Sequence, residues 1–296
     1  MVIAIFEYMF NKINTIAGLS ESVRKNLKGL YPKGEIEQFI FLIFNHLLNY
    51  SKIDIHLNSH DSVSDEIFQK VRSIIAQLKE YQPIQYIFGE TEFYGLKFFL
   101  NQHVLIPRQE TEELVQWVIS ENTAKNIRIL DVGTGSGCIA VVLARHIENS
   151  VVDAFDISVK ALETAIKNAS MNGAKVNFYK YDILGDEVLP EKVVYDIIVS
   201  NPPYVRESEK HLSDPNVTGF EPHEAIFVVD EDAFIFYKAI AAFGKKYLKK
   251  GGNIYLEINE ALGTETKALL LDSGYHDVVL KRDINNKDRM LKAKLI

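Results

Sequence analysis

The sequence predicts an α/β fold in which helices cover both faces of a mostly parallel sheet, with a helical bundle in front of it. Beyond Pro107, short apolar segments alternate with amphipathic ones, which is typical of parallel strands buried on both faces. Residues 1–82 instead show helical periodicity. The chain has 296 residues, which is enough for two domains of ordinary size.

Composition narrows the class of protein. The chain is 47% hydrophobic and 25% charged, as in globular proteins, and 33 basic against 40 acidic residues give a net charge of −7. A globally basic nucleic-acid binder is disfavoured, although a local basic patch stays open. The apolar run 39–44 is too short to span a membrane, and the single Cys138 fits a reducing compartment. We therefore expect a cytoplasmic protein with no membrane partner and no specific nucleic-acid partner.

The first predicted domain, residues 1–82, is a small helical bundle. Apolar residues at three- and four-residue steps predict a helix over 67–78, with Ser64 as its N-cap and an end before Pro83. Residues 36–48 are apolar on almost every side, as expected of the central helix of a bundle. A helix around 5–16 should end at Gly18. Bundles of this kind more often bind partners than carry out chemistry.

Residues 83–107 predict a hairpin linker. Aromatic side chains punctuated by glycines, at 86–89 and 93–99, are typical of paired strands. The third predicted domain, 108–296, then supplies five parallel strands, at 127–130, 151–155, 176–179, 196–199 and 253–258. Helices fit at 158–170 and 232–248, and two last strands, around Val278 and at 289–295, suggest an antiparallel pair. The predicted sheet has seven strands.

The first strand of this sheet runs into a glycine turn, Gly133-Thr134-Gly135-Ser136-Gly137, directly after Asp131-Val132. Glycines after a parallel strand let the backbone approach a ligand, and the next helix offers its first amides to that ligand. A dinucleotide-binding turn would need a third glycine where this chain has Cys138. The alternative is a tight turn without a ligand.

Two acids follow at the ends of neighbouring strands. Asp156 ends the second strand, which is the usual place for a carboxylate that accepts ribose hydroxyl groups. Asp182, after the third strand, would lie near the base or ribose of a bound nucleoside, or else is a solvated loop acid. Together with the glycine turn, these residues predict a ligand with a nucleoside end.

The fourth strand ends in the tetrad Asn201-Pro202-Pro203-Tyr204. It could simply be a rigid turn. The functional interpretation is that the Asn201 side-chain oxygen and the Pro202 carbonyl each accept one N–H of a planar amide or amine nitrogen. Tyr204 would offer a flat face to the planar group. We find no nucleophilic triad and no metal-ligand spacing, and Cys138 is expected to be a small buried residue.

The glycine turn with its flanking acids resembles that of class I S-adenosylmethionine-dependent methyltransferases, whose fold is Rossmann-like. An acid before the glycines suits a cofactor that carries an ammonium group and a sulfonium. The resemblance implies S-adenosyl-L-methionine as cofactor and S-adenosyl-L-homocysteine as product. It also implies cofactor contacts from Gly133, Thr134, Gly135, Ser136, Gly137, Asp156, Asp182 and Asn201.

The tetrad is shared by methyltransferases that act on planar nitrogen, in DNA adenine and in protein glutamine. Further motifs make the chain resemble HemK-type release factor glutamine methyltransferases; they lie at 82–89, 93–95, 104–112, 220–222, Ala225, Asp283 and 288–289. Residues 227–232 lack a usual glycine pair, and Asn259 and Leu262 replace a usual glycine and glutamine. We expect these departures to alter the geometry of peripheral loops and details of partner recognition, but not the reaction.

The resemblance implies methylation of the glutamine in the Gly-Gly-Gln motif of peptide chain release factors. It implies catalytic roles for Asn201, Pro202 and Tyr204, substrate contact from Pro203 as well, and docking of the release factor on residues 1–82. Arg108, Glu110 and Thr111 would shape the mouth of the site or merely begin a helix. The alternatives are a DNA or RNA adenine amino-methyltransferase, which would need a basic recognition surface, and a non-enzymatic cofactor-binding adaptor, against which the intact tetrad argues.

Overall fold

The computed structural model describes residues 14–122, 126–186, 188–189 and 193–296. The chain divides into two compact units, Met1–Phe88 and Gly89–Ile296. None of the helices in the described ranges combines the length and apolar character needed to cross a membrane.

The described part of the N-terminal unit consists of helices that share one apolar core. Their bounds are α2 (Ile16–Leu27), α3 (Lys33–Leu48), α4 (Lys52–Leu57), α5 (Asp65–Lys79) and α6 (Ile84–Phe88). The predicted helices at 36–48 and 67–78 are confirmed as α3 and α5, and the Ser64 hydroxyl accepts a hydrogen bond from the Ile67 amide at 3.3 Å. The core of the unit lies between α2, α3 and α5, with Phe44 and Leu78 fully buried.

Two N-terminal expectations need correction. The predicted helix at 5–16 lies mostly outside the described residues, and Gly18 does not end a helix but lies in the first turn of α2. Thr15 is the N-cap of α2, because its hydroxyl accepts a hydrogen bond from the Gly18 amide at 3.0 Å. Residues 86–88, expected to be extended, are helical in α6, where the amides of Tyr86 and Ile87 both donate to the Pro83 carbonyl.

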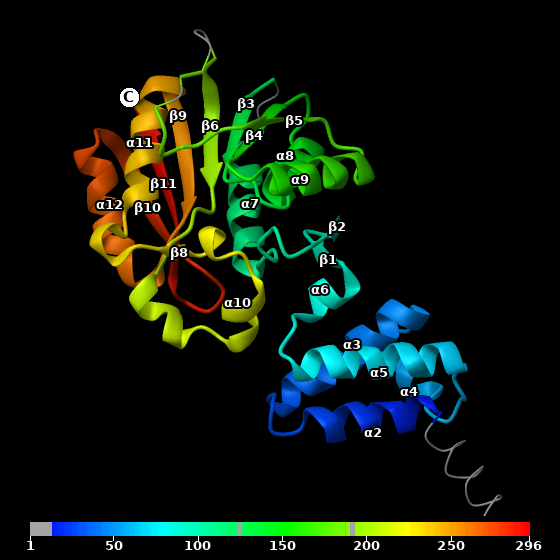
Figure 1. Ribbon diagram of the computed structural model, residues 1–296. Helices are drawn as coiled ribbons and strands as arrows, with labels where there is room; N and C mark the ends of the chain where they lie inside the picture. Colours follow the sequence, from blue (N-terminus) through cyan, green and yellow to red (C-terminus); the bar gives the residue numbers. More distant parts are fainter. Residues whose placement is uncertain (1–13, 123–125, 187, 190–192) are drawn as a thin grey trace, which may run out of the picture. The chain divides into compact units, whose positions relative to one another are not determined.

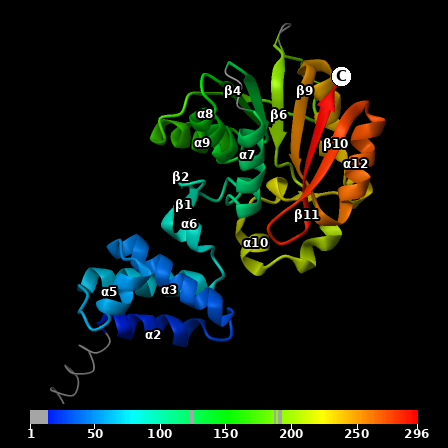
Figure 2. The same ribbon diagram turned by 180° about the vertical axis from the view of Figure 1, so that it is seen from behind.

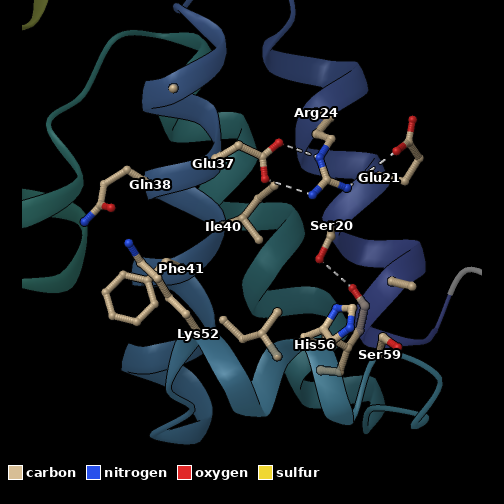
Figure 3. Close-up of a pocket in the computed structure, with 14 residues that line it drawn as sticks. Ser20, Glu21, Arg24, Glu37, Gln38, Ile40, Phe41, Lys52, His56 and Ser59 are labelled. Carbon is tan, nitrogen blue, oxygen red and sulfur yellow. Dashed lines mark hydrogen bonds and ion pairs between the residues drawn. The ribbon is translucent and has the colours of Figure 1, made fainter.

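A hollow of about 640 Å³ in the N-terminal unit is lined by residues of α2, α3 and α4 (Figure 3). Arg24 of α2 reaches across to Glu37 of α3 and donates two hydrogen bonds to its carboxylate, at 2.7 and 2.9 Å. The Lys52 ammonium lies over the Phe41 ring, 5.1 Å from its centre. Arg24, Glu37 and Lys52 therefore already have partners within this hollow.

The C-terminal unit is built on a seven-stranded sheet of order β10-β11-β9-β6-β3-β4-β5 (Figure 1). The five strands from β9 to β5 in this order are parallel to one another, whereas β11 is antiparallel to both β9 and β10, as the sequence predicted. The strand bounds are β3 (Arg128–Val132), β4 (Val151–Asp156), β5 (Val176–Lys180), β6 (Tyr195–Ser200), β9 (Leu248–Glu257), β10 (Tyr275–Arg282) and β11 (Asp288–Leu295).

The sheet is buried on both faces, in agreement with the predicted fold class. Successive residues of β3 alternate between two cores: Ile129 packs in one and Leu130 in the other, and both are fully buried. Helices α7 (Gln109–Glu121), α8 (Cys138–His146) and α9 (Val159–Met171) contribute side chains to the first core. Helices α11 (Ile235–Tyr247) and α12 (Gly263–Asp272) contribute to the second. Figure 2 shows the same ribbon from the opposite side, with α7, α8 and α9 labelled.

The remaining elements lie before the sheet or beside the ends of its strands. The hairpin β1 (Glu90–Phe93) and β2 (Leu96–Phe99) buries Phe93 and Phe98 in the first core, so it belongs to the C-terminal unit. After β6 the chain forms β7 (Val205–Arg206), α10 (Pro215–Phe220) and β8 (Phe227–Val228), and β7 pairs with β8 in parallel.

Candidate active site

A cavity of about 280 Å³ lies at the carboxyl ends of β3, β4 and β6. Parallel strands present their following loops at one edge of the sheet, and ligands bind at that edge in folds of this kind. β3 has β4 on one side and β6 on the other. The loops after these three strands all contribute lining residues, among them Gly133, Asp156 and Asn201.

The glycine turn is shaped by backbone contacts. Gly133 and Gly135 have φ of +73° and +53°, a region that side chains disfavour, and a Cβ on either would meet nothing within 4 Å. These two glycines line the cavity. The amides of Gly133 and Thr134 both donate to the Phe155 carbonyl, at 2.9 and 2.8 Å. The open space beside the turn is thus available to a ligand.

Three other residues of the predicted turn have roles inside the protein. A Cβ on Gly137 would lie 3.0 Å from the Cβ of Ala165, so this glycine permits close packing of α8 on α9. Ser136 is buried and its carbonyl accepts a hydrogen bond from Asn168. The Thr134 hydroxyl donates to the Asp131 carboxylate at 2.6 Å. Their predicted cofactor contacts stay predictions.

Asp131 is fully buried beneath the turn. Burial raises the pKa of its carboxyl to about 7, and one of its oxygens, Oδ1, has no hydrogen-bond partner among the described residues. The neighbouring Cys138 is also buried, as expected, and burial raises the pKa of its thiol to about 12. Asp131 therefore acts on the turn through Thr134, and Cys138 is not a thiolate nucleophile at neutral pH.

The two predicted nucleoside-binding acids line the same cavity. The Asp156 carboxylate accepts the Gly135 amide at 2.8 Å through one oxygen and the Ser158 amide at 2.8 Å through the other. Burial raises its pKa. Asp182 accepts the Leu184 amide at 2.9 Å. A carboxylate has about four acceptor positions, so Asp156 retains acceptor capacity for a ligand hydroxyl group.

The tetrad begins where β6 ends, and its first three residues line the cavity. The Asn201 side-chain amide donates to the Thr111 hydroxyl at 3.1 Å, and that hydroxyl donates to the buried Glu257 carboxylate at 2.7 Å. The Tyr204 hydroxyl donates to the other oxygen of Glu257, at 3.0 Å. The predicted contact of the Tyr204 ring with a planar substrate stays a prediction, since its hydroxyl is turned to the protein interior.

Side chains from distant segments hold the loops around the tetrad. Arg108 donates to Glu221 at 2.6 Å, and Glu221 also accepts the Ile106 amide at 3.1 Å, which ties the segment before α7 to the segment after α10. Asn259 donates to the Tyr204 carbonyl at 3.1 Å. Asn259, expected to alter peripheral loop geometry and partner detail, thus also contacts the backbone of the tetrad.

Sequence reasoning left the supporting residues unresolved. Thr111 was weighed equally as part of the site mouth and as a helix start, and the structure places it against Asn201. Arg289 lies in one of the motifs that carry the family resemblance, and neither it nor Glu257 has an expected role at the site. A signal existed for Glu257, because it ends β9, the strand next to β6, at the same edge of the sheet. The contact of Arg289 with the tetrad, 3.5 Å from the Tyr204 hydroxyl, has no local sequence signal.

The sheet order and the two loops on one cavity define an α/β domain of the methyltransferase class. A model described as "Methyltransferase small domain" matches residues 110–214, and one described as "PrmC N-terminal domain" matches residues 30–89. Among solved structures, a T. thermophilus 16S rRNA N2 G1207 methyltransferase in complex with AdoMet and guanosine has the same fold. Its TM-score is 0.50 at 20% identity, over 70% of this chain and 50% of that one.

Two relatives are similar over most of their length. A release factor glutamine methyltransferase of Flavobacterium psychrophilum is 44% identical over 271 residues, covering 90% of this chain and 94% of the relative. One of Bacteroides thetaiotaomicron is 41% identical, covering 92% and 97%. The chain belongs to the release factor glutamine methyltransferase family, a family of enzymes.

Proposed function

We propose that this chain transfers a methyl group from S-adenosyl-L-methionine to the side-chain amide nitrogen of the glutamine in the Gly-Gly-Gln motif of peptide chain release factors. The observation that carries the proposal is that one cavity is lined both by the glycine turn and by the first three residues of the tetrad. The names of the relatives at 44% and 41% identity support the choice of acceptor.

The donor set of the cavity fits S-adenosyl-L-methionine. Gly133 and Gly135 leave open space for close backbone approach, and Asp156 has free acceptor positions for ribose hydroxyls. Asp182 and the apolar side chains of Phe155 and Ile183 line the same cavity and would hold the nucleoside end. When bound, this cofactor supplies a methyl group activated by its sulfonium.

The tetrad would hold the acceptor amide. An amide nitrogen is a weak nucleophile because its lone pair is delocalised into the carbonyl group. Asn201 Oδ1 and the Pro202 carbonyl would each accept one hydrogen of the substrate amide, which orients the nitrogen and favours charge on it. Two tandem prolines restrict the backbone of this loop, so the loop loses little conformational entropy when the substrate binds. Orientation of this kind can lower a barrier by roughly 7–11 kcal/mol.

We further infer that residues 1–82 dock the release factor, with residues 83–107 as linker and 108–296 as the catalytic domain. The surface that supports this inference includes two large apolar side chains of α4, Ile53 and Leu57, which are 70% and 72% exposed. Changing both to aspartate should raise KM for a whole release factor and leave KM for a short Gly-Gly-Gln peptide unchanged. Equal effects on both substrates would contradict docking at this surface.

Mass spectrometry of a purified release factor, incubated with the protein and S-adenosyl-L-methionine, tests the central proposal. We expect the Gly-Gly-Gln peptide to gain the mass of one methylene, located on the glutamine side chain by fragmentation. An unmodified release factor together with methylated adenine in an oligonucleotide control would overturn the proposal in favour of the adenine alternative.

A further inference from the structure

Behind the tetrad lies a chain of hydrogen bonds that the proposed chemistry does not itself require. It runs from the Asn201 amide through the Thr111 hydroxyl to the Glu257 carboxylate, with steps of 3.1 and 2.7 Å. Thr111 is 2% exposed and Glu257 1% exposed. The three residues come from separate segments: the β6 loop, α7 and the end of β9. Burying a carboxylate costs free energy unless several hydrogen-bond donors surround it.

The direction of each bond in this chain follows from the carboxylate. An ionised Glu257 only accepts, so the single hydroxyl hydrogen of Thr111 must be donated to it. Thr111 can then offer only a lone pair to Asn201, and the Asn201 group that meets it must be the NH₂. The other end of the amide, Oδ1, has no hydrogen-bond partner among the described residues. It is therefore the atom left to accept a hydrogen from the substrate.

The surroundings of Glu257 are consistent with its role as acceptor. Tyr204 donates to its second oxygen at 3.0 Å, and burial keeps the pKa of Tyr204 well above its ordinary value, so this hydroxyl stays protonated. Arg289 lies 3.5 Å from the same hydroxyl and pairs with Asp283 at 3.1 Å. Burial raises the pKa of Glu257, while Arg289 lowers it and Glu110 raises it.

We propose that Thr111 and Glu257 are positioning residues that fix the orientation of the Asn201 amide, so that Oδ1 and not Nδ2 faces the acceptor nitrogen. The proposal rests on the proposed function, which needs an acceptor at this point. Without the hydrogen bonds from Thr111 and Glu257, the Asn201 amide could rotate by half a turn and present its two N–H donors to the substrate amide. A donor facing a donor would repel the substrate nitrogen and would lose the hydrogen bond that orients it.

Thr111→Val tests the proposal because it keeps the shape of the side chain and removes the hydroxyl group. We expect kcat on a release factor to fall about tenfold to a hundredfold, with the Kd for S-adenosyl-L-methionine within about twofold of wild type. Thr111→Ser keeps the hydroxyl and should recover most of the lost kcat. Thr266→Val is the matched control, because Thr266 is also buried and its hydroxyl donates to the Leu262 carbonyl, outside the hydrogen-bond series from Asn201 through Thr111 to Glu257.

Glu257→Gln is the second variant, because its amide can donate to Thr111 and so reverse the chain without changing its shape. It should lower kcat by a similar factor where the new NH₂ faces Thr111, and full kcat in both Glu257→Gln and Thr111→Val would overturn the proposal. A readout without substrate is the side-chain ¹⁵N–¹H signal pair of Asn201 in the whole protein, assigned with Asn201→Ala. Thr111→Val should shift this pair and Thr111→Ser should not. If wild type leaves release factors unmodified, the proposed function fails, whereas an unshifted pair in Thr111→Val defeats the positioning proposal.

Discussion

The turn after β3 and the tetrad after β6 leave neighbouring strands of one sheet, yet they are held in different ways. The turn is fixed by backbone amides of Gly133, Thr134 and Gly135, which donate to the end of β4. The tetrad is held by side chains that come from distant parts of the chain: Asn201 and Thr111 are 90 residues apart, and Tyr204 and Glu257 are 53 apart. The proposed cofactor edge is thus built into the local backbone, whereas the proposed acceptor edge depends on the completed fold.

The sharpest separation of the two edges is expected from Asn201→Ala. Removing an acceptor aimed at the reacting amide should lower kcat by roughly a hundredfold to a thousandfold, as does loss of one donor in other preorganised sites. Titration calorimetry should find the affinity for S-adenosyl-L-methionine nearly unchanged. Asn285→Ala, at an exposed position, serves as control. Full activity of Asn201→Ala on a release factor would mean that the amide clamp is wrong.

Gly137→Ala probes the packing beneath the turn. Gly137 and Gly251 share a φ of +81°, but only a Cβ on Gly137 would meet another atom within 4 Å, in Ala165. We expect Gly251→Ala to lower the free energy of unfolding by about 1 kcal/mol, and Gly137→Ala by about 3 kcal/mol. Urea denaturation measures both. Equal losses would show that α8 and α9 relax around the added methyl group.

Asp131→Asn tests the buried acid under the turn. Its pKa of about 7 exceeds the ordinary value of 3.8, so between these values the folded chain holds a proton that the unfolded chain has released. This contribution to stability is present at low pH and is lost as pH rises toward 7. From about pH 5 to about pH 7.5, the variant should gain about 2 kcal/mol in unfolding free energy relative to wild type. Urea denaturation without cofactor should show this divergence; parallel pH profiles would contradict it.

Asp156→Ala should have the smallest effect and the opposite signature to Asn201→Ala. It removes acceptor positions for ribose and frees the amides of Gly135 and Ser158. We expect the Kd for S-adenosyl-L-methionine to rise about tenfold, with a smaller change of kcat at saturating cofactor. Asp186→Ala, in an exposed loop, is the control. A drop in kcat at unchanged Kd would reverse the assignment of the two edges.

The elements that the sequence predicted correctly are those whose signal is local. Apolar runs marked the strands of the sheet, and the glycine turn after β3 was visible because each glycine lies within a few residues of the strand end. The antiparallel pair β10–β11 was predicted from the lack of a helix between its strands. At the site, Gly133, Gly135, Asp156, Asp182 and Asn201 were named from position alone, and all of them line one cavity.

The failures have physical causes. Aromatic residues 86–88 suggested a strand, but Pro83 begins a helix by accepting two amides and outweighs their preference for strands. Gly18 was taken as a helix end, although Thr15 caps α2 just before it. α12 was not predicted, because its three adjacent leucines at 269–271 show little helical period. The partnership of Thr111 with Glu257 spans 146 residues, a distance at which local patterns carry no information.

A side-chain hydroxyl group adds to the backbone pairing that joins β3 and β6 below the two loops. Ser200 is the last residue of β6 and lies opposite Val132, the last residue of β3; its Oγ donates to the Val132 carbonyl at 2.7 Å. The spacing between the glycine turn and the start of the tetrad is thereby set by the distance between adjacent strands, about 4.8 Å. Changes in the loops beyond residue 204 therefore leave the turn and the start of the tetrad in the same register.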